Sequence, residues 1–213
     1  MMRINDRFRP TTLQDIVGQK PVALLRHLVA NPHSSALLLE GPPGCGKTSS
    51  AVALANELGC ADEWSGLEVI PATELTIDRA RELFLHDLKL RPLEGRGWHV
   101  LILEELEAVH PQVSRFLKVH LERLPQRCIV VATSNGAGGV EEALLQRFRL
   151  YRFAGDESFA AACQARVASI WREIGTGPLP RDWKAWGWRS GTWSLRLCLD
   201  QLADFALLAG GVA

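Results

Sequence analysis

Residues 41–48, GPPGCGKT, decide the fold of this chain, because the segments on both sides of them are as informative as the stretch itself. The apolar run 36–39 comes directly before it and is long enough for one buried strand. The segment 49–59, SSAVALANELG, comes directly after it, favours a helix and places Gly59 as a C-terminal stop. The stretch is therefore a loop between the end of a strand and the start of a helix.

The spacing of glycine, lysine and threonine in this loop predicts a site for a nucleoside triphosphate. Backbone N–H groups and the open N-terminus of the following helix offer positive dipoles to phosphate, and glycines allow a close approach. The side chain of Lys47 would reach the β- and γ-phosphates, and the hydroxyl of Thr48 would bind Mg²⁺. The loop residues expected to hold the nucleotide are Gly41, Pro42, Pro43, Gly44, Cys45, Gly46, Lys47, Thr48 and Ser49.

The composition is that of an ordinary globular protein: 213 residues, 47% hydrophobic and 23% charged. The 24 basic and 24 acidic side chains balance, so bulk charge gives no support for a nucleic-acid partner. The five cysteines form no CxxC pair, which favours free thiols in a reducing cytoplasm over a zinc site or disulfides. Without an apolar signal core or a run of about 18 apolar residues, we expect no membrane partner.

The hydrophobic pattern predicts an α/β fold. Short buried strands are expected at 36–39, 67–71, 98–103, 128–132 and 150–153. Helices are expected at 21–31, 49–59, 76–90, 113–124 and 141–148. Because strands and helices alternate, the sheet should be parallel, with helices on both faces.

Polar side chains follow two of the expected strands. Glu104 and Glu105 come at the end of one, and Asn135 comes just after the next. Since ligands bind at the carboxyl ends of parallel strands, these residues and Thr48 should share one site. Two alternatives stay open: the glutamates could begin a solvated helix, and the asparagine could be a turn residue.

The pattern changes after residue 154, where only helices are expected. One helix is predicted at 158–174 and another at 193–208, with a linker at 175–180. We therefore expect two domains, a nucleotide-binding α/β domain at 1–154 and a small all-α domain at 155–213. Residues 1–20 are polar and basic and, taken alone, indicate a surface arm.

The segment 7–19, RFRPTTLQDIVGQ, resembles the N-terminal signature of clamp-loader-type AAA+ ATPases. The matching residues are Phe8, Arg9, Pro10, Leu13, Asp15, Ile16, Val17, Gly18 and Gln19. In the family's order, LILEELEAV at 101–109 resembles the Walker B strand, and 116–135 resembles the segment that ends in the sensor 1 residue. ALLQRF at 143–148 resembles the motif that carries the arginine finger, so the resemblance covers nearly all of 4–200.

This resemblance implies a P-loop NTPase domain with a helical lid, ATP and Mg²⁺ as cofactors, and other AAA+ subunits as partners. It implies that Thr48 and Glu104 hold the metal, that Glu105 activates the attacking water and that Asn135 positions it. Arg147 would reach into the site of the next subunit, where an arginine can contribute about 10³–10⁵ in rate. The residues expected to lie against the adenine are Arg9, Pro10, Ile16 and Val17.

The sensor 2 position is ambiguous. Placing Gly191 on the family's glycine puts Ser194 where an arginine is expected. Arg196, two residues further on, would serve if its helix is registered differently.

The sequence departs from the family pattern at several points. The usual Asp-Glu pair is replaced by Glu104 and Glu105, so we expect weak or slow hydrolysis. Gln146 and Phe148 replace the serine and cysteine that usually frame the arginine finger. The sequence ends at Ala213, after the expected lid, so the resemblance implies a chain that lacks the collar domain and assembles by another route.

The leading hypothesis is an ATPase that acts in DNA replication or repair like a sliding-clamp loader subunit, with a clamp and primed or single-stranded DNA as partners. The main alternative is a nucleotide-dependent assembly scaffold, or a regulator of recombination or transposition, with slow or no hydrolysis. A protein-remodelling motor is disfavoured, because ATELTIDR at 72–79 offers no aromatic pore residue.

Overall fold

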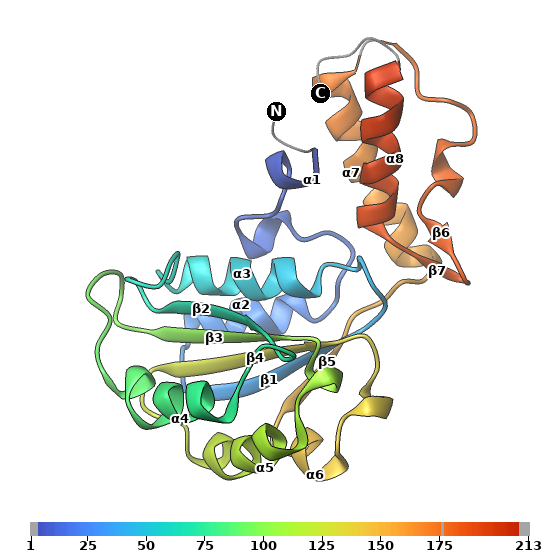
Figure 1. Cartoon of the computed structure of the whole chain (residues 1–213). Coiled ribbons are helices and arrows are strands. Elements are labelled where there is room, and N and C mark those ends of the chain that lie inside the picture. Colours follow the sequence, from blue (N-terminus) through green and yellow to red (C-terminus); the bar gives the residue numbers. More distant parts are fainter. Residues whose placement is uncertain (1–3, 176, 209–213) are drawn as a thin grey trace.

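The computed structural model of the chain describes residues 4–175 and 177–208. The outer ends of the two predicted domains, 1–3 and 209–213, lie outside these described residues, as does residue 176 of the predicted linker. The chain forms an α/β part built on one large sheet and a helical lid, residues 155–208, that stands beside it (Figure 1).

The sheet of the α/β part has five strands. Its strands, in chain order, are β1 (Ser35–Glu40), β2 (Leu67–Pro71), β3 (His99–Glu104), β4 (Cys128–Ser134) and β5 (Arg149–Arg152). Their order across the sheet is β2-β3-β4-β1-β5, and every neighbouring pair is parallel. The predicted α/β fold with a parallel sheet is therefore confirmed, and β1 lies in the interior of the sheet with its carboxyl end beside that of β4.

Helices cover both faces of this sheet (Figure 1). One face carries α2 (Val22–Ala30) and α3 (Lys47–Glu57), and the other carries α4 (Ile77–Leu85), α5 (Pro111–His120) and α6 (Glu142–Leu145). Alternate residues of β1 enter the two cores, with Leu37 and Leu39 on the α3 side and Leu38 on the α5 side. Because both faces are buried, the strand reads in sequence as an unbroken apolar run.

The predicted helix stop at Gly59 is confirmed. Gly59 has φ 81°, the left-handed conformation that ends many helices, and the N–H of Cys60 donates to the carbonyl of Ala55 at 2.9 Å. The helix predicted at 76–90 is shorter than expected, since α4 ends at Leu85 and a 3₁₀ turn follows at Asp87–Lys89. This tighter turn brings Leu88 into the core under the sheet.

The lid contains a feature that the sequence pattern did not predict. Between α7 (Glu157–Ile174) and α8 (Leu195–Leu208) lies a short antiparallel hairpin of β6 (Trp188–Arg189) and β7 (Thr192–Trp193). Trp193 was expected to begin the last helix, but its N–H donates to the carbonyl of Gly155 at 2.8 Å, so that helix begins at Leu195. The buried indole of Trp193 packs edge-on against Phe159.

The N-terminal segment is not the surface arm expected from its polarity. Its short helix α1 (Ile4–Arg7) contacts α8, and Ile4 and Leu13 are both buried in the core on the α3 side of the sheet. Arg7 pairs with Glu173 at 2.8 Å, and Asn5 donates a hydrogen bond to Asp200. The arm therefore links the α/β part to the lid.

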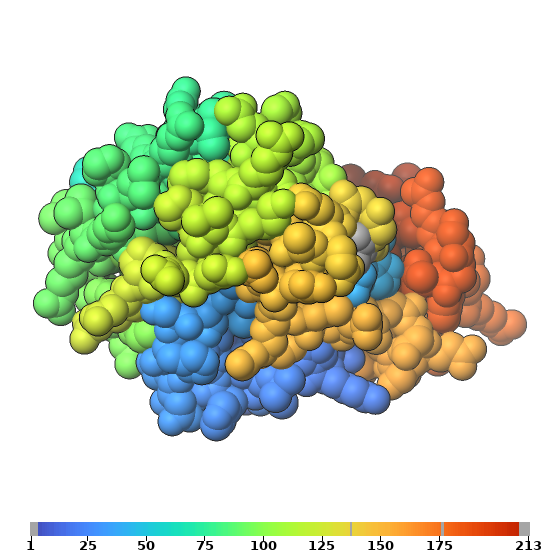
Figure 2. All heavy atoms as spheres, turned by 90° about the horizontal axis from the view of Figure 1, so that it is seen from below, coloured from blue at the N-terminus to red at the C-terminus, as the bar shows by residue number. Residues whose placement is uncertain are grey.

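The space-filling view from below shows the lid, in orange to red, at one side of the α/β part (Figure 2). Within the described ranges, no helix has both the length and the apolar character needed to cross a membrane.

Candidate nucleotide-binding site

The loop at 41–48 joins β1 to α3 as the sequence predicted. Gly44 and Gly46 have φ 76° and 97°, a left-handed conformation that glycine adopts at little cost. Gly46 is the N-cap of α3, so the free N–H groups of the first helical turn face the space above the loop. This is the local geometry that an anionic phosphate needs.

The ammonium group of Lys47 is held among oxygen atoms. Its Nζ donates to the carbonyls of Gly41 at 2.7 Å and Pro42 at 3.0 Å, and to Oδ1 of Asn135 at 3.1 Å. Lys47 is only 8% exposed, and this burial lowers the pKa of its ammonium group. The cation is thus fixed at the mouth of the loop, next to the end of β4.

Thr48 and Glu104 meet across the gap between α3 and β3. The Thr48 hydroxyl donates to Oε1 of Glu104 at 3.0 Å. A hydroxyl and a carboxylate are hard oxygen donors of the kind that Mg²⁺ prefers, so this pair fits the predicted metal.

Glu105 follows with φ 57°, and its N–H donates to the hydroxyl of Thr133 at 3.3 Å. A glutamate in the left-handed conformation is uncommon and costs free energy. Both neighbouring glutamates, Glu104 and Glu105, line one cavity.

A third carboxylate, Glu107, belongs to the same group and was not predicted as a site residue. Its Oε1 accepts from the N–H of Asn135 at 3.1 Å and from Nδ2 of Asn135 at 3.2 Å. Among the described residues its Oε2 is buried and has no hydrogen-bond partner. Burial alone would raise the pKa of Glu107, but hydrogen bonds from Asn135, Ser134 and its own backbone outweigh it and lower the pKa.

A cavity of about 820 Å³ collects these groups together with parts of the N-terminal arm and the lid. The predicted site residues that line it are Arg9, Pro10, Ile16, Val17, Pro43, Gly44, Cys45, Gly46, Lys47, Thr48, Ser49, Glu104, Glu105, Asn135 and Arg196. Gly41 and Pro42 lie outside this lining and instead present their carbonyls to Lys47.

Gln19 fixes the arm to the loop. Its side-chain amide donates to the carbonyls of Cys45 at 3.0 Å and Ala154 at 2.9 Å, and its Oε1 accepts from the N–H of Ala154 at 2.9 Å. Gln19 is buried, so these bonds form away from water and are costly to break. One side chain thereby ties together the arm, the phosphate loop and the segment that leads into the lid.

Both sensor 2 candidates lie beside the phosphate loop. The N–H of Leu195 donates to the carbonyl of Gly44 at 3.1 Å, and a Cβ added to Gly44 would overlap Oγ of Ser194. Arg196 lines the cavity and is close enough to Lys47 for its charge to act on that lysine. Of the two, only Arg196 brings a cation to the site.

Arg147 lies elsewhere. Its Nη2 pairs with Oε1 of Glu122 at 2.7 Å, and its Nε donates to the carbonyl of Lys118 at 3.3 Å. It does not line the cavity of its own chain.

Several cavity residues were not predicted as site residues. Thr133 carried a signal, because it is polar and stands at the end of a buried strand. Four further polar residues come from the arm and the lid, where no motif marks them, and they meet only in the folded chain: Asn5, Asp6, Arg166 and Asp200.

The sequence model of one family, the ATPase family associated with various cellular activities (AAA), matches residues 37–155. This match covers more than half of the chain, and the chain therefore belongs to the AAA family of ATPases. The matched segment runs from β1 to the start of the lid and so contains the phosphate loop and both strand-end carboxylates.

Among curated proteins, the chain is similar to the replication factor C small subunit of Methanosarcina acetivorans. The identity is 30% over 151 residues, which are 70% of this chain and 45% of that protein. Replication factor C subunit 3 of Saccharomyces cerevisiae is 31% identical over 151 residues, 70% of this chain and 44% of that protein. The chain thus spans about half the length of these relatives, and the predicted resemblance to clamp-loader-type AAA+ ATPases is confirmed.

Solved structures agree on the fold. The Thermotoga maritima RuvB Holliday junction branch migration motor superimposes with a TM-score of 0.66 at 19% identity, over 95% of this chain and 67% of that one. A Thermotoga maritima protein related to the DNA polymerase III gamma subunit gives a TM-score of 0.58 at 16% identity, over 71% of this chain and 51% of that one. At these identities the likeness concerns the fold.

Proposed function

We propose that this chain binds ATP with Mg²⁺ in the cavity above the phosphate loop and hydrolyses it slowly, as one subunit of an AAA+ assembly that acts on DNA. The observation that carries the proposal is the contact of Thr48 with Glu104 at 3.0 Å, next to the ammonium of Lys47. This contact supports the proposal because it brings the two residues that we propose as metal ligands close to the cation that we propose as the phosphate ligand.

Each residue of this group has a role in the proposed reaction. Bound Mg²⁺ would supply charge neutralisation at the phosphate oxygens. Lys47 is held by neutral carbonyls rather than by a carboxylate, so phosphate oxygens can replace those acceptors. Glu105 has no side-chain hydrogen bond among the described residues, which leaves its carboxylate available to orient a water molecule.

Asn135 links the two sides of the site. It accepts from Lys47 and donates to Glu107, so its amide is held by a cation on one side and a carboxylate on the other. If Lys47 moves when phosphate binds, an amide held in this way moves with it. The movement would then reach the end of β4 and the loop after it. Glu107 acts here as a positioning residue.

The partners are inferred from the relatives. Replication factor C subunits and a branch migration motor are named for work on DNA, so DNA is the partner we propose. Arg147 supports assembly, because it lies outside the cavity of its own chain and is one-third exposed. It would act in the cavity of a neighbouring subunit, as an arginine finger does.

Mixing two inactive variants tests both the catalytic and the assembly parts of this proposal. We expect Glu105→Gln and Arg147→Ala each to lose at least about 100-fold in ATP turnover when assayed alone. A one-to-one mixture should recover about one quarter of wild-type turnover, because random assembly pairs an intact Glu105 with an intact Arg147 at a quarter of head-to-tail interfaces.

Arg149→Ala is the matched control, since Arg149 is also exposed and lies two residues from Arg147. It should keep wild-type turnover. A mixture as inactive as its two components would show that the site is not shared between subunits.

The scaffold remains the second candidate, and Glu104 is the observation in its favour. The longer glutamate already reaches the Thr48 hydroxyl, so the metal site can form while the distances to the phosphates differ from those of an aspartate. Wild-type protein that binds ATP and assembles, but shows no turnover with or without primed-template DNA, would support the scaffold and exclude the ATPase motor.

A further inference from the structure

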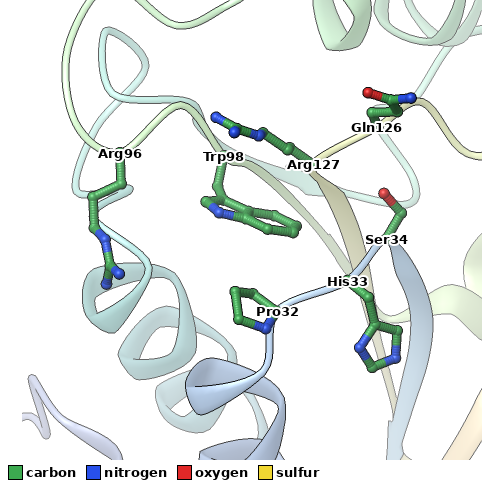
Figure 3. Close-up of a pocket in the computed structure, with 7 residues that line it drawn as sticks. All are labelled: Pro32, His33, Ser34, Arg96, Trp98, Gln126 and Arg127. Atoms are coloured by element: carbon green, nitrogen blue, oxygen red, sulfur yellow. The ribbon is translucent and has the colours of Figure 1, made fainter.

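The opposite edge of the sheet carries a second hollow, of about 490 Å³, that the proposed ATP site does not use (Figure 3). It is lined by residues that come just before β1, β3 and β4, among them His33, Arg96, Trp98 and Arg127. These three strands are neighbours in a parallel sheet, so the segments that lead into them converge at its amino edge.

The charged side chains at this hollow are arginines. A Cβ built on Gly97 would lie 3.1 Å from Nε of Arg91 and 3.3 Å from Nη1 of Arg127, so two guanidinium groups flank the same glycine. Arg127 lines the hollow, and Arg91 lies next to it without being part of the lining. Within the described part of the chain, neither of them nor Arg96 forms an ion pair with a carboxylate. Like charges at this distance repel, and a bound anion would relieve that repulsion.

Among the described residues, the guanidinium group of Arg96 makes one hydrogen bond and no ion pair. Its Nη1 donates to the carbonyl of Glu57 at 3.1 Å, a neutral acceptor that leaves the positive charge uncompensated. Arg127 has φ 57° and its carbonyl accepts from the N–H of His99 at 2.8 Å. A non-glycine residue in this conformation costs free energy, and such residues cluster at binding sites.

Trp98 provides the apolar part of the hollow. Figure 3 shows its indole ring between Pro32 and the side chain of Arg127, and Trp98 is one of the residues that line the hollow. The ring is half-buried and packs against the core on the α3 side, while the Trp98 carbonyl accepts from Sγ of Cys60 at 3.2 Å. The indole is therefore held in place beside guanidinium groups that have no carboxylate partner among the described residues.

We propose that this hollow binds single-stranded nucleic acid, with Arg91, Arg96 and Arg127 on phosphate oxygens and Trp98 stacked against a base. Arginines bind phosphates with several donors at once, and aromatic rings stack on unpaired bases of any sequence. An acidic peptide would use the guanidinium groups but would leave the indole without a matching partner. The site lies at the far edge of the sheet from the phosphate loop, and it does not depend on ATP binding.

Fluorescence anisotropy of a labelled oligothymidylate with the whole chain, titrated with NaCl, tests the proposal. The double variant Arg91→Gln/Arg127→Gln should bind at least about tenfold more weakly at low salt. The slope of log affinity against log salt should become shallower by about 1.4, since each lost phosphate contact removes about 0.7 on a single strand.

The matched control is Arg172→Gln/Arg189→Gln, which changes the net charge equally on exposed arginines of the lid. It should bind within about twofold of wild type. Trp98→Leu should weaken binding by about fivefold or more and leave the salt slope unchanged, because stacking releases no counterions. Thermal melting of every variant confirms that the protein is folded.

Any one of four results would overturn the proposal. Equal losses of affinity in the site and control variants would mean that the oligonucleotide responds only to the net charge of the protein. Wild-type affinity in Trp98→Leu, or equal competition by polyglutamate and by oligothymidylate, would assign the hollow to acidic protein segments instead. Displacement by millimolar inorganic phosphate as effective as by the oligonucleotide would reduce the site to one for a single anion.

Discussion

At the carboxyl edge of the sheet, the ammonium of Lys47 lies among three oxygen acceptors. At the amino edge, the guanidinium groups of Arg91 and Arg127 flank Gly97, and neither has a carboxylate partner in the part of the chain that the structure describes. Both groups are cations beside the ends of parallel strands. The first is placed by a chain of hydrogen bonds that continues through Asn135 to Glu107. The second is placed by backbone turns and by the packing of Trp98.

This difference separates a site that is organised by its own residues from one that an external anion would complete. In the hydrogen-bonded site, removal of one residue disturbs its partners, so the effects of two substitutions should not add. In the arginine hollow, Arg91 and Arg127 flank the same glycine, so their coupling comes from charge repulsion rather than from shared hydrogen bonds, and salt should weaken it. The following predictions test the comparison.

Lys47→Ala should have the largest effect. We expect ATP affinity to fall by roughly 100-fold, since a charge-assisted contact to phosphate is lost and Asn135 loses its cationic donor. Isothermal titration calorimetry with ATP measures the loss. Binding of oligothymidylate should stay at the wild-type level, and a parallel loss of both ligands would show that the two edges of the sheet are one site.

Glu107→Gln should reduce ATP turnover by about tenfold with little change in ATP affinity, because the amide of Asn135 loses a charged acceptor but the phosphate loop is intact. The measurement is steady-state hydrolysis beside Glu74→Gln, an exposed glutamate outside the site. Unchanged turnover in Glu107→Gln would remove Glu107 from the group that positions Asn135.

The same variant makes a prediction about acid stability. The pKa of Glu107 is lowered in the folded chain from its ordinary value of 4.5, so its ionised form stabilises the fold above that pH. This contribution is lost as the pH falls through the folded pKa. We therefore expect the melting temperature of wild type to fall more steeply than that of Glu107→Gln below pH 4.5, and parallel curves would contradict it.

Glu104→Asp should have the smallest effect and the opposite sign. We expect turnover to rise by about threefold, because the shorter carboxylate moves away from the Thr48 hydroxyl and leaves more room for a metal ion between them. The measurement is ATP turnover as a function of Mg²⁺ concentration. A decrease in turnover at every Mg²⁺ concentration would show that this chain depends on the longer side chain.

Much of the fold could be predicted from the sequence because parallel strands buried on both faces give unbroken apolar runs. The run Ala36 to Leu39 and the polar residues after it indicated a strand, a loop and a helix in the right order. The hairpin of the lid could not be predicted, since each of its strands has only two residues and no alternating pattern can develop. The break after Leu85 was missed because apolar residues continue at helical spacing beyond it.

The candidate site also contains residues that the sequence predicted and residues that it did not. Lys47, Thr48, Glu104, Glu105 and Asn135 could be named because each stands at a strand end or in a motif of fixed spacing. Glu107 lies in the stretch 101–109 that resembles the Walker B strand, but the sequence assigned it no role, and its importance rests on one hydrogen-bonded partner 28 residues away in sequence.

The sequence by itself determined the phosphate loop, the parallel sheet and the carboxylates at its carboxyl edge, because these depend on local spacing and on the two-faced burial of each strand. Only the tertiary structure decided that the arm packs on the lid, that Arg196 reaches the phosphate loop and that three arginines gather at the amino edge. Such contacts join segments far apart in the chain, and their geometry follows from how the strands are ordered across the sheet.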